Sequence, residues 1–413
     1  MGFDNKNSYW IDTFIKKYEE SFKKVDLLDR KSEYWRFASP SIWYESYNNN
    51  KLPSEKQIEN LSFNYDDITD CCIKFKDGVL DISSLAELNK DEKNIEVSSY
   101  KDAVTNENHW SSQKFGVAQL NAEKPYERPL ALFNGLNSRD GVFIKFKKGI
   151  RKKFHIIYEG NEQKKSTIRN LFDFEEDVDI TIIEHFYGNS KYNIVSEFFN
   201  DKNSKFEHIK IINQDITDTF IYHLFGNCQK HSNIKAINFS LSENPVRNEV
   251  NLHLEGPKCN ATVASLGFGQ KATSICDNTV FISHQEESSK SRQIIKNALS
   301  GGAKAIFQGK IYVSSVAQKT DGYQMSNGLI LTDDCQFLVK PELEIYADDV
   351  VCSHGSISGT LNDDHLFYLQ SRGIPLAEAQ KHLIQAFFAE ILNEINDEKV
   401  INHIEKQISI KLA

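Results

Sequence analysis

Short apolar runs that follow one another without helical stretches between them are the feature that most constrains the fold of this chain. From about residue 140 to 350 such runs recur roughly every 12 to 16 residues and are rich in β-branched and aromatic residues. No intervening segment is long enough for the helix of a β–α–β crossover. A sandwich, a barrel and a parallel β-helix all fit, because no strict repeat selects among them. The pattern predicts many short strands, among them Asp179–Ile183, Phe206–Ile212, Ile234–Phe239 and Val250–Leu254.

The placement of glycine and tryptophan divides the chain into three parts. Two glycines lie in residues 1–115, seventeen in 116–359 and one after that, while all four tryptophans precede residue 111. Because glycine marks tight turns, the middle of the chain is the part that turns often. We therefore predict a helix-rich N-terminal region (1–100), a β core (101–360) and a C-terminal helical region (361–413). The first region opens with an amphipathic helical pattern of Trp10, Phe14, Ile15, Tyr18 and Phe22.

The C-terminal region carries clear helix boundaries. Gly373 is expected to end a short helix over Asp364–Ser371, and Pro375 to open the next one. A last helix is expected to use Val400, Ile401, Ile404 and Ile408. The apolar stripe expected on the middle helix consists of Leu376, Ala379, Leu383, Ala386, Phe387 and Ile391.

Composition excludes several classes of function. The 413 residues carry a formal charge of -9, which argues against a protein whose main function is to bind nucleic acid or an anionic membrane. The polar start lacks the apolar core of a signal peptide, and no run of 18 apolar residues occurs, so we expect an intracellular, cytoplasmic protein without a membrane span. Seven scattered cysteines without a C-x-x-C pair predict reduced thiols rather than a disulfide framework.

Two motifs have structural explanations that outweigh the functional ones. The run Gly267-Phe-Gly269-Gln-Lys-Ala272 matches a permissive dinucleotide fingerprint, but a strand-like segment follows it where that fingerprint needs a helix. We interpret it as a turn between strands. The segment from Lys145 to Lys153 holds six bases in nine residues, and apolar runs on both sides indicate a solvated turn between strands. A P-loop, G-x-x-x-x-G-K-[ST], does not occur in the sequence.

Cys352 and His354 are the candidate metal ligands. Residues two apart on a strand share one face, and thiolate and imidazole both bind iron or zinc. Two ligands do not complete a site, so others must come from elsewhere in the chain or from a partner. A buried thiol beside an ordinary surface histidine is the competing explanation, and a nucleophilic Cys–His pair is a weaker one. For His223, His253 and His284 we expect structural roles.

A series of segments in the C-terminal half carries a family resemblance. They are His284, Ser289, Ser291, Gln293, Phe307–Val313, Ala317–Gln324, Asn327–Leu331, Pro341–Gly355 and Leu366–Ile374, with weaker similarity upstream at Glu33–Phe37 and Phe133–Asn137. In these residues the chain resembles the SufB/SufD family of iron–sulfur cluster assembly scaffolds. Gly355 follows His354 where SufB-like chains tend to have an acid, which favours the SufD branch, although Ser356 and Ile357 stand where SufD usually has Ala-Thr.

The resemblance implies a right-handed parallel β-helix core flanked by helical regions, and a non-catalytic scaffold subunit. It further implies pairing with SufB through the core and docking of the SufC ATPase on the C-terminal helices, at Phe367, Tyr368, Leu369, Arg372 and Gly373. SufC would supply the missing P-loop, and its ATP-driven dimerisation would rearrange the SufB–SufD interface.

At that interface the resemblance makes His354, with Cys352, a ligand of a transient iron ion or cluster, completed by SufB; no cofactor is expected to stay on the isolated chain. Three questions stay open: whether the complex binds flavin, whether the chain forms a homodimer when SufB is absent, and whether it is located in the bacterial cytosol or in a plastid-like organelle. Two other functions also stay open: a β-helix enzyme acting on polysaccharides, and a purely structural partner subunit in which Cys352 and His354 are inert.

Overall fold

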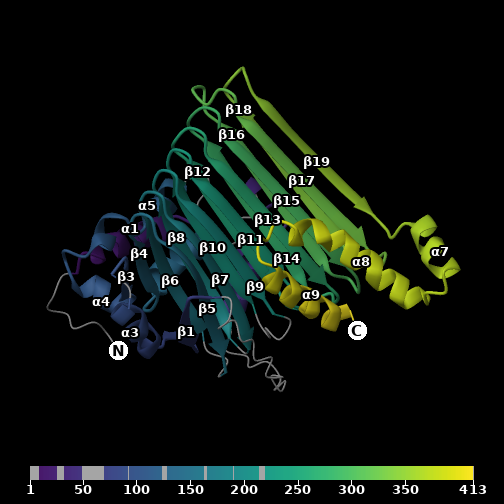
Figure 1. The fold of residues 1–413 in the computed structure, drawn as a ribbon, viewed down its shortest axis with the longest axis horizontal. Helices are drawn as coiled ribbons and strands as arrows, with labels where there is room; N and C mark the ends of the chain where they lie inside the picture. Colours follow the sequence, from purple (N-terminus) through teal and green to yellow (C-terminus); the bar gives the residue numbers. More distant parts are fainter. Residues whose placement is uncertain are drawn as a thin grey trace.

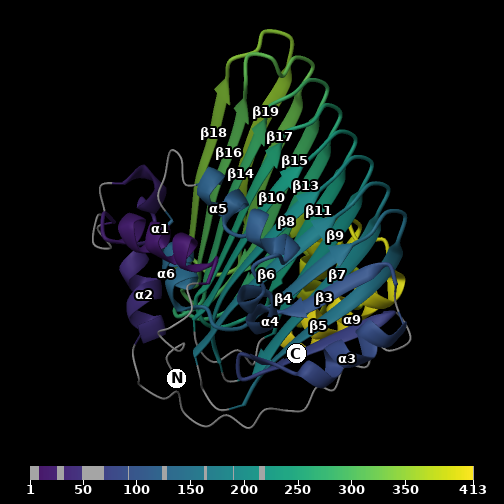
Figure 2. The same ribbon diagram turned by 90° about the vertical axis from the view of Figure 1, so that its left-hand side faces the viewer.

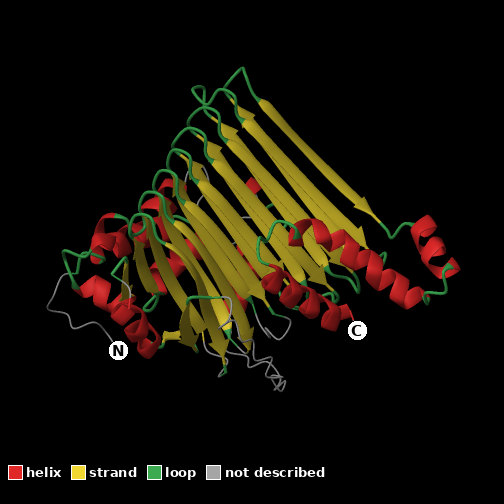
Figure 3. Ribbon diagram, in the orientation of Figure 1, coloured by secondary structure: helices red, strands yellow, loops and turns green. Residues whose placement is uncertain are grey.

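Two sheets, parallel except for the pairs β1–β2 and β3–β4 near the N-terminus, wind into a β-solenoid, with helices at both ends of the sequence (Figure 1, Figure 3). The predicted mainly-β fold of β-helix type with flanking helices is confirmed. The computed structural model describes residues 9–25, 32–48, 69–91, 93–122, 128–161, 165–188, 190–213 and 219–412.

From β4 onward the strands alternate between the two sheets along the chain, so that each turn of the solenoid adds one strand to each sheet. All four runs predicted as strands lie in strands. The ten-stranded first sheet contains β1 (Cys71–Lys76), β2 (Val79–Leu80), β5 (Arg151–Gly160), β7 (Asp179–Gly188), β9 (Lys205–Ile212), β11 (Asn233–Ser240), β13 (Asn260–Gly269), β15 (Lys290–Leu299), β17 (Asp321–Ile330) and β19 (Val351–Gly359). The nine-stranded second sheet contains β3 (Ile95–Ser99), β4 (Val142–Phe146), β6 (Lys165–Phe174), β8 (Lys191–Asn200), β10 (Phe220–Cys228), β12 (Val246–Leu254), β14 (Ile275–His284), β16 (Lys304–Val313) and β18 (Gln336–Ile345).

The turns of the solenoid differ in length but share one corner geometry. Ile183 pairs with Ile209, 26 residues on, whereas Ile294 pairs with Met325, 31 residues on. At one corner of successive turns a residue other than glycine has a positive φ, a conformation that costs little only for glycine, Asn and Asp. Each of these residues donates its backbone N–H to a carbonyl of the next turn, which stacks the corners. They are Asp177, Asn203, His231, Lys258, Ser288 and Lys319.

The space between the sheets is filled mainly by apolar side chains. Rings stack along the solenoid axis, as Tyr158 does on Phe186 with centroids 4.3 Å apart and Phe146 on Phe174 at 4.9 Å. Each such pair contributes about 0.5–1.5 kcal/mol beyond its buried area. Glu184 and His208 are an exception inside this core, and they pair with each other at 2.9 Å.

Most of the N-terminal helices pack on the outer face of the second sheet (Figure 2), whereas Leu85 and Leu88 of the helix Ile82–Asp91 belong to the core between the sheets. Gly135 permits close contact there, because a Cβ at this position would lie 2.5 Å from the Tyr18 ring. Within residues 1–100 the chain also forms β1, β2 and β3, since segments such as Cys71–Lys76 alternate in burial as strands do. Helices extend past residue 100 as far as Asn137. The elements are α1 (Asp12–Phe22), η1 (Glu33–Trp35), α2 (Pro40–Asn48), α3 (Ile82–Asp91), α4 (Tyr100–Thr105), η2 (Trp110–Gln113), α5 (Val117–Ala122) and α6 (Pro129–Asn137).

The C-terminal helices are α7 (Asp363–Ser371), α8 (Leu376–Leu392) and α9 (Glu398–Leu412). Helices α8 and α9 pack against apolar side chains on the outer face of the first sheet. The predicted helix boundaries at Gly373 and Pro375 are confirmed. The predicted stripe on α8 is partly wrong, because the helix is rotated about its axis relative to our expectation: Leu376 is 47% exposed. The buried residues of α8 are Ala379, Ile384, Phe388, Ile391 and Leu392.

The other motifs have the places expected of them. Gly267 and Gly269 end β13, and the chain then turns into β14. The basic segment forms the turn between β4 and β5, where Lys148 pairs with Glu176 at 2.9 Å. All seven cysteines are free thiols. Among the helices that the structure describes, none combines the length and apolar character needed to cross a bilayer.

Three histidines lie together where α9 covers the first sheet. The ring centroids of His155 and His185 are 6.1 Å apart, and those of His185 and His403 are 5.7 Å apart. Burial, and for His155 and His403 also repulsion from the neighbouring imidazoles, lowers the pKa to about 2 for His155, about 4 for His185 and about 3 for His403. All three rings are therefore neutral at pH 7.

Acid is expected to destabilise the protein through these histidines. In the unfolded chain a histidine titrates near pH 6.5, so between pH 6.5 and pH 4 the unfolded state binds a proton that folded His185 does not. The stability that neutral His185 contributes is complete above pH 6.5 and falls by about 3 kcal/mol once the pH reaches about 4. Urea unfolding of wild type and His185→Gln at several pH values measures this loss. The variant should lose less stability than wild type, whereas exposed His382→Gln should follow wild type; parallel curves for all three would contradict the prediction.

Candidate functional site

The solenoid has an open end at its last turn. Strand β19 lies at the outer edge of the first sheet and β18 at the outer edge of the second. The apolar side chains Tyr346, Val351 and Ile357 are 59%, 72% and 59% exposed there. Long edge strands with exposed apolar side chains present unpaired backbone groups to any further strand. This end is therefore suited to binding another protein.

Cys352 and His354 lie on this edge. Both are on β19, paired with Gly322 and Gln324 of β17, whose positions are buried toward the interior. The two side chains thus share one face of the strand, as the sequence predicted. Cys352 is partly buried against Ile311, Val313 and their neighbours, whereas His354 is exposed.

The pair alone is not a complete metal site. Burial raises the pKa of the Cys352 thiol, so that it is protonated at neutral pH and is not ready to bind metal as a thiolate. Within the described ranges no group of three His, Cys, Asp or Glu residues is placed to hold a metal ion. Asp349, which is near in sequence, is engaged through its backbone with Gln318 and Lys319.

Helix α7 presents the second set of predicted residues. Phe367 and Tyr368 are 73% and 57% exposed, and no residue of α7 is buried. The Arg372 guanidinium lies 5.3 Å from the centre of the Tyr368 ring, and Gly373 has a φ of +85° that ends the helix. Leu369 is partly buried. Figure 1 shows α7 standing away from both sheets.

The two predicted sets do not form one site. Cys352 lies near the start of β19 and α7 follows its end, so they are separated by about seven strand residues, roughly 23 Å. Only three residues, 360–362, connect β19 to α7. Helix α7 therefore lies close in the chain to the end of the strand that holds Cys352 and His354.

Lysines of the first sheet hold the C-terminal helices in place. Lys296 of β15 pairs with Glu390 at 2.5 Å and donates to the Phe387 carbonyl, while Lys235 of β11 donates to the Glu394 carbonyl at 2.7 Å. Lys153 of β5 pairs with Asp397 at 2.6 Å. The carboxylates of Glu390 and Asp397 thus bind the C-terminal helical region to the solenoid.

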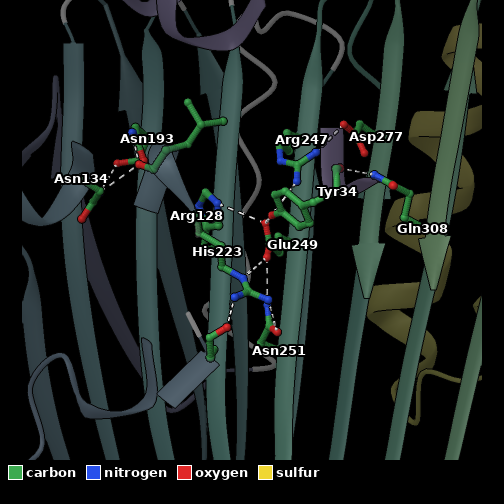
Figure 4. A network of polar contacts seen from close by, with 12 residues as sticks. Tyr34, Arg128, Asn134, Asn193, His223, Arg247, Glu249, Asn251, Asp277 and Gln308 are labelled. Carbon is green, nitrogen blue, oxygen red and sulfur yellow. Dashed lines mark hydrogen bonds and ion pairs between the residues drawn. The ribbon is translucent and has the colours of Figure 1, made fainter. Parts of the chain in front are cut away.

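A buried polar network fixes the N-terminal segment to the second sheet (Figure 4). Glu249 of β12 accepts hydrogen bonds from Arg128, Arg247, Tyr34 and Asn251. His223 lies 3.4 Å from the same carboxylate, and Arg247 also pairs with Asp277 at 2.6 Å. Sequence reasoning missed this network, because Arg247-x-Glu249-x-Asn251 has the alternation of a solvent-facing strand. His223 has the structural role that we expected of it. His284 is also buried, and His253 is partly buried.

Comparison with known proteins identifies the family. The family described as "SUF system FeS cluster assembly, SufBD core domain" matches residues 156–387, more than half of the chain. The chain belongs to the SufB/SufD family. The matched region starts in β5 and ends in α8, so it includes the open end, Cys352, His354 and α7.

Curated proteins show similarity to this chain over shorter stretches. The iron–sulfur cluster assembly protein SufD of Escherichia coli is 36% identical over 174 residues, which are 42% of this chain and 41% of that protein. SufD of Bacillus subtilis is 28% identical over 165 residues, 40% of this chain and 37% of the relative. The chloroplastic protein ABCI7 of Arabidopsis thaliana is 37% identical over 111 residues, 27% and 23% of the two chains. The matches span less than half the length of these relatives. They support the SufD branch that the sequence predicted.

Proposed function

We propose that this protein is a non-catalytic scaffold subunit of iron–sulfur cluster assembly, of the SufD type. It pairs with a SufB subunit through the open end of the solenoid and binds the SufC ATPase through α7. The open end is the observation that supports the proposal. Its two edge strands expose apolar side chains beside Cys352 and His354, two candidate ligands that do not complete a metal site by themselves. A partner strand would cover the edge and add the missing ligands.

In this proposal iron and sulfide are the cargo, and His354 is the ligand that this chain provides. The exposed imidazole is available to an ion at the interface, whereas the Cys352 thiol must first lose its proton. ATP-driven movement of SufC acts on α7 and, through residues 360–362, on β19. The pull changes the access to both ligands.

The rival enzyme function has less support. A β-helix enzyme of the polysaccharide class needs acids and bases on an open face of a sheet. Helices α8 and α9 cover the outer face of the first sheet from β7 to β15, with apolar side chains between them. The cytoplasmic location stays a prediction.

Co-expression tests the proposed function. The chain is produced with SufB and SufC from its own source and analysed by anaerobic size exclusion with mass determination. A complex of one SufB, two SufC and one copy of this chain supports the proposal. A chain that elutes alone or as a homodimer in the presence of both partners contradicts it, and an assay on acidic polysaccharides then becomes the next test.

The double variant Phe367→Ala/Tyr368→Ala is expected to lose one SufC from the complex while SufB stays bound. Both side chains are more than half exposed, so their truncation removes a contact surface and leaves the fold intact. The control is Val79→Ala, which truncates another exposed apolar residue, 55% exposed, on β2 at the other end of the solenoid. Full retention of SufC by the double variant would show that α7 is not the docking helix.

A further inference from the structure

Gln324 is a buried amide beside the open end. Every second residue of β17 faces the interior, and among these Gln324 is 0% exposed. Neither its amide oxygen nor its amide nitrogen has a hydrogen-bond partner in the part of the chain that the structure describes. Buried amides in proteins are nearly always paired, so this one requires an explanation.

The strand register places Gln324 next to His354. The two residues are partners in the pairing of β17 with β19, and partners on neighbouring strands point to the same face with Cβ atoms about 5 Å apart. An amide and an imidazole at that separation are within reach of a hydrogen bond.

Gln293 continues this row inward. It is the partner of Gln324 on β15 and is also 0% exposed. Its amide nitrogen donates to the Lys310 carbonyl at 3.3 Å, but its amide oxygen has no partner among the described residues. The row Gln293, Gln324, His354 therefore runs from the interior to the open edge and contains three amide atoms that have no partner among the described residues.

We propose that Gln324 is a positioning residue for His354. Its amide oxygen accepts a hydrogen bond from one ring nitrogen of His354, and its amide nitrogen donates to the oxygen of Gln293. This arrangement gives partners to all three amide atoms. It also fixes one tautomer of His354 and turns the other ring nitrogen toward the open end, as the outer partners of metal-binding histidines do. The expected effect of Gln324 on iron binding rests on the proposed function, whereas its effect on the tautomer of His354 does not.

The tautomer is measured directly by ¹⁵N NMR of the full chain labelled on its histidine ring nitrogens, at pH 8, with His354 assigned from the spectrum of His354→Gln. One tautomer should predominate in the wild type. Gln324→Met, which keeps the length of the side chain without an acceptor, should populate both tautomers, and Gln324→Glu should restore one. If the wild type and Gln324→Met show the same ratio of the two His354 tautomers, the inference is overturned.

Ser326→Ala is the matched control. Ser326 lies on the same strand and face, is 0% exposed and has an unpartnered hydroxyl among the described residues, but its partner on β19 is Ser356. Its removal should leave the His354 tautomer unchanged. A change as large as that of Gln324→Met would show a general loosening of the edge and would also overturn the inference.

Ferrous iron binding separates this inference from the proposed function. In the anaerobic complex with SufB and SufC, Gln324→Met should bind Fe²⁺ about 10-fold more weakly than wild type. If the tautomer responds to Gln324→Met but neither this variant nor His354→Ala changes iron binding, the positioning role stands and the iron ligand role of His354 fails. If the tautomer does not respond, the positioning role fails whatever the iron measurement shows.

Discussion

Replacing Glu249 by glutamine is expected to destabilise the protein by about 3–5 kcal/mol, the usual effect of removing one partner from a buried ion pair. The carboxylate is 0% exposed, and Arg128, Arg247 and Tyr34 share it as an acceptor. Burial by itself raises the pKa of Glu249, but Arg128, His223 and Arg247 outweigh it and hold the pKa well below its ordinary value. The carboxylate is therefore charged, and a neutral amide removes a charge that the arginines require.

Urea unfolding of the wild type and Glu249→Gln measures the change. The matched control is Glu19→Gln, which neutralises an exposed partner of Lys23 in α1 and should leave the unfolding midpoint where it is. We also expect the N-terminal segment to become sensitive to protease first, because Tyr34 anchors it to Glu249. If Glu249→Gln unfolds at the same urea concentration as Glu19→Gln, the network does not stabilise the fold.

Local pattern was sufficient to predict several strands of the solenoid and the helix boundaries near the C-terminus, but it missed β1, β2 and β3. Alternating residues located strands such as β7 and β9, and Gly373 and Pro375 located helix boundaries, because each signal depends on neighbours in sequence. The solenoid itself was not visible in the pattern. Its repeat is a backbone conformation at one corner, adopted by residues as different as Asp177, His231 and Lys258, and the distance between corners changes from turn to turn.

The candidate site divides in the same way. Cys352 and His354 share a face because they are two apart on one strand, which the sequence shows directly. Gln324 lies 30 residues from His354 and becomes its neighbour only through strand pairing. The network around Glu249 likewise depends on Tyr34 and Arg128, which come from distant parts of the chain. The sequence alone does not show which strands pair or which segments cover the sheets. In the sequence such residues therefore have the same pattern as ordinary exposed polar residues.

Replacing His354 by alanine is expected to leave the complex with SufB and SufC assembled while it lowers the affinity for iron by roughly 10-fold or more. The side chain is exposed on an edge strand, so its loss should not disturb the core. Among the described residues no group of three metal-binding side chains lies there, so loss of the imidazole leaves the Cys352 thiol, whose pKa burial raises, as the remaining candidate ligand. Iron and sulfide are determined after anaerobic reconstitution of the purified complex.

The control for this experiment is His382→Ala, which removes an exposed histidine on α8, the helix that packs against β13 and β15 rather than on the edge strand β19. Cys352→Ser provides the second comparison, and a smaller loss than in His354→Ala would make the imidazole the main ligand. Unchanged iron and sulfide in His354→Ala would overturn the ligand role and favour a purely structural subunit. Loss of SufB from the same variant would instead show that His354 contributes to the contact between subunits, either directly or through a shared metal ion.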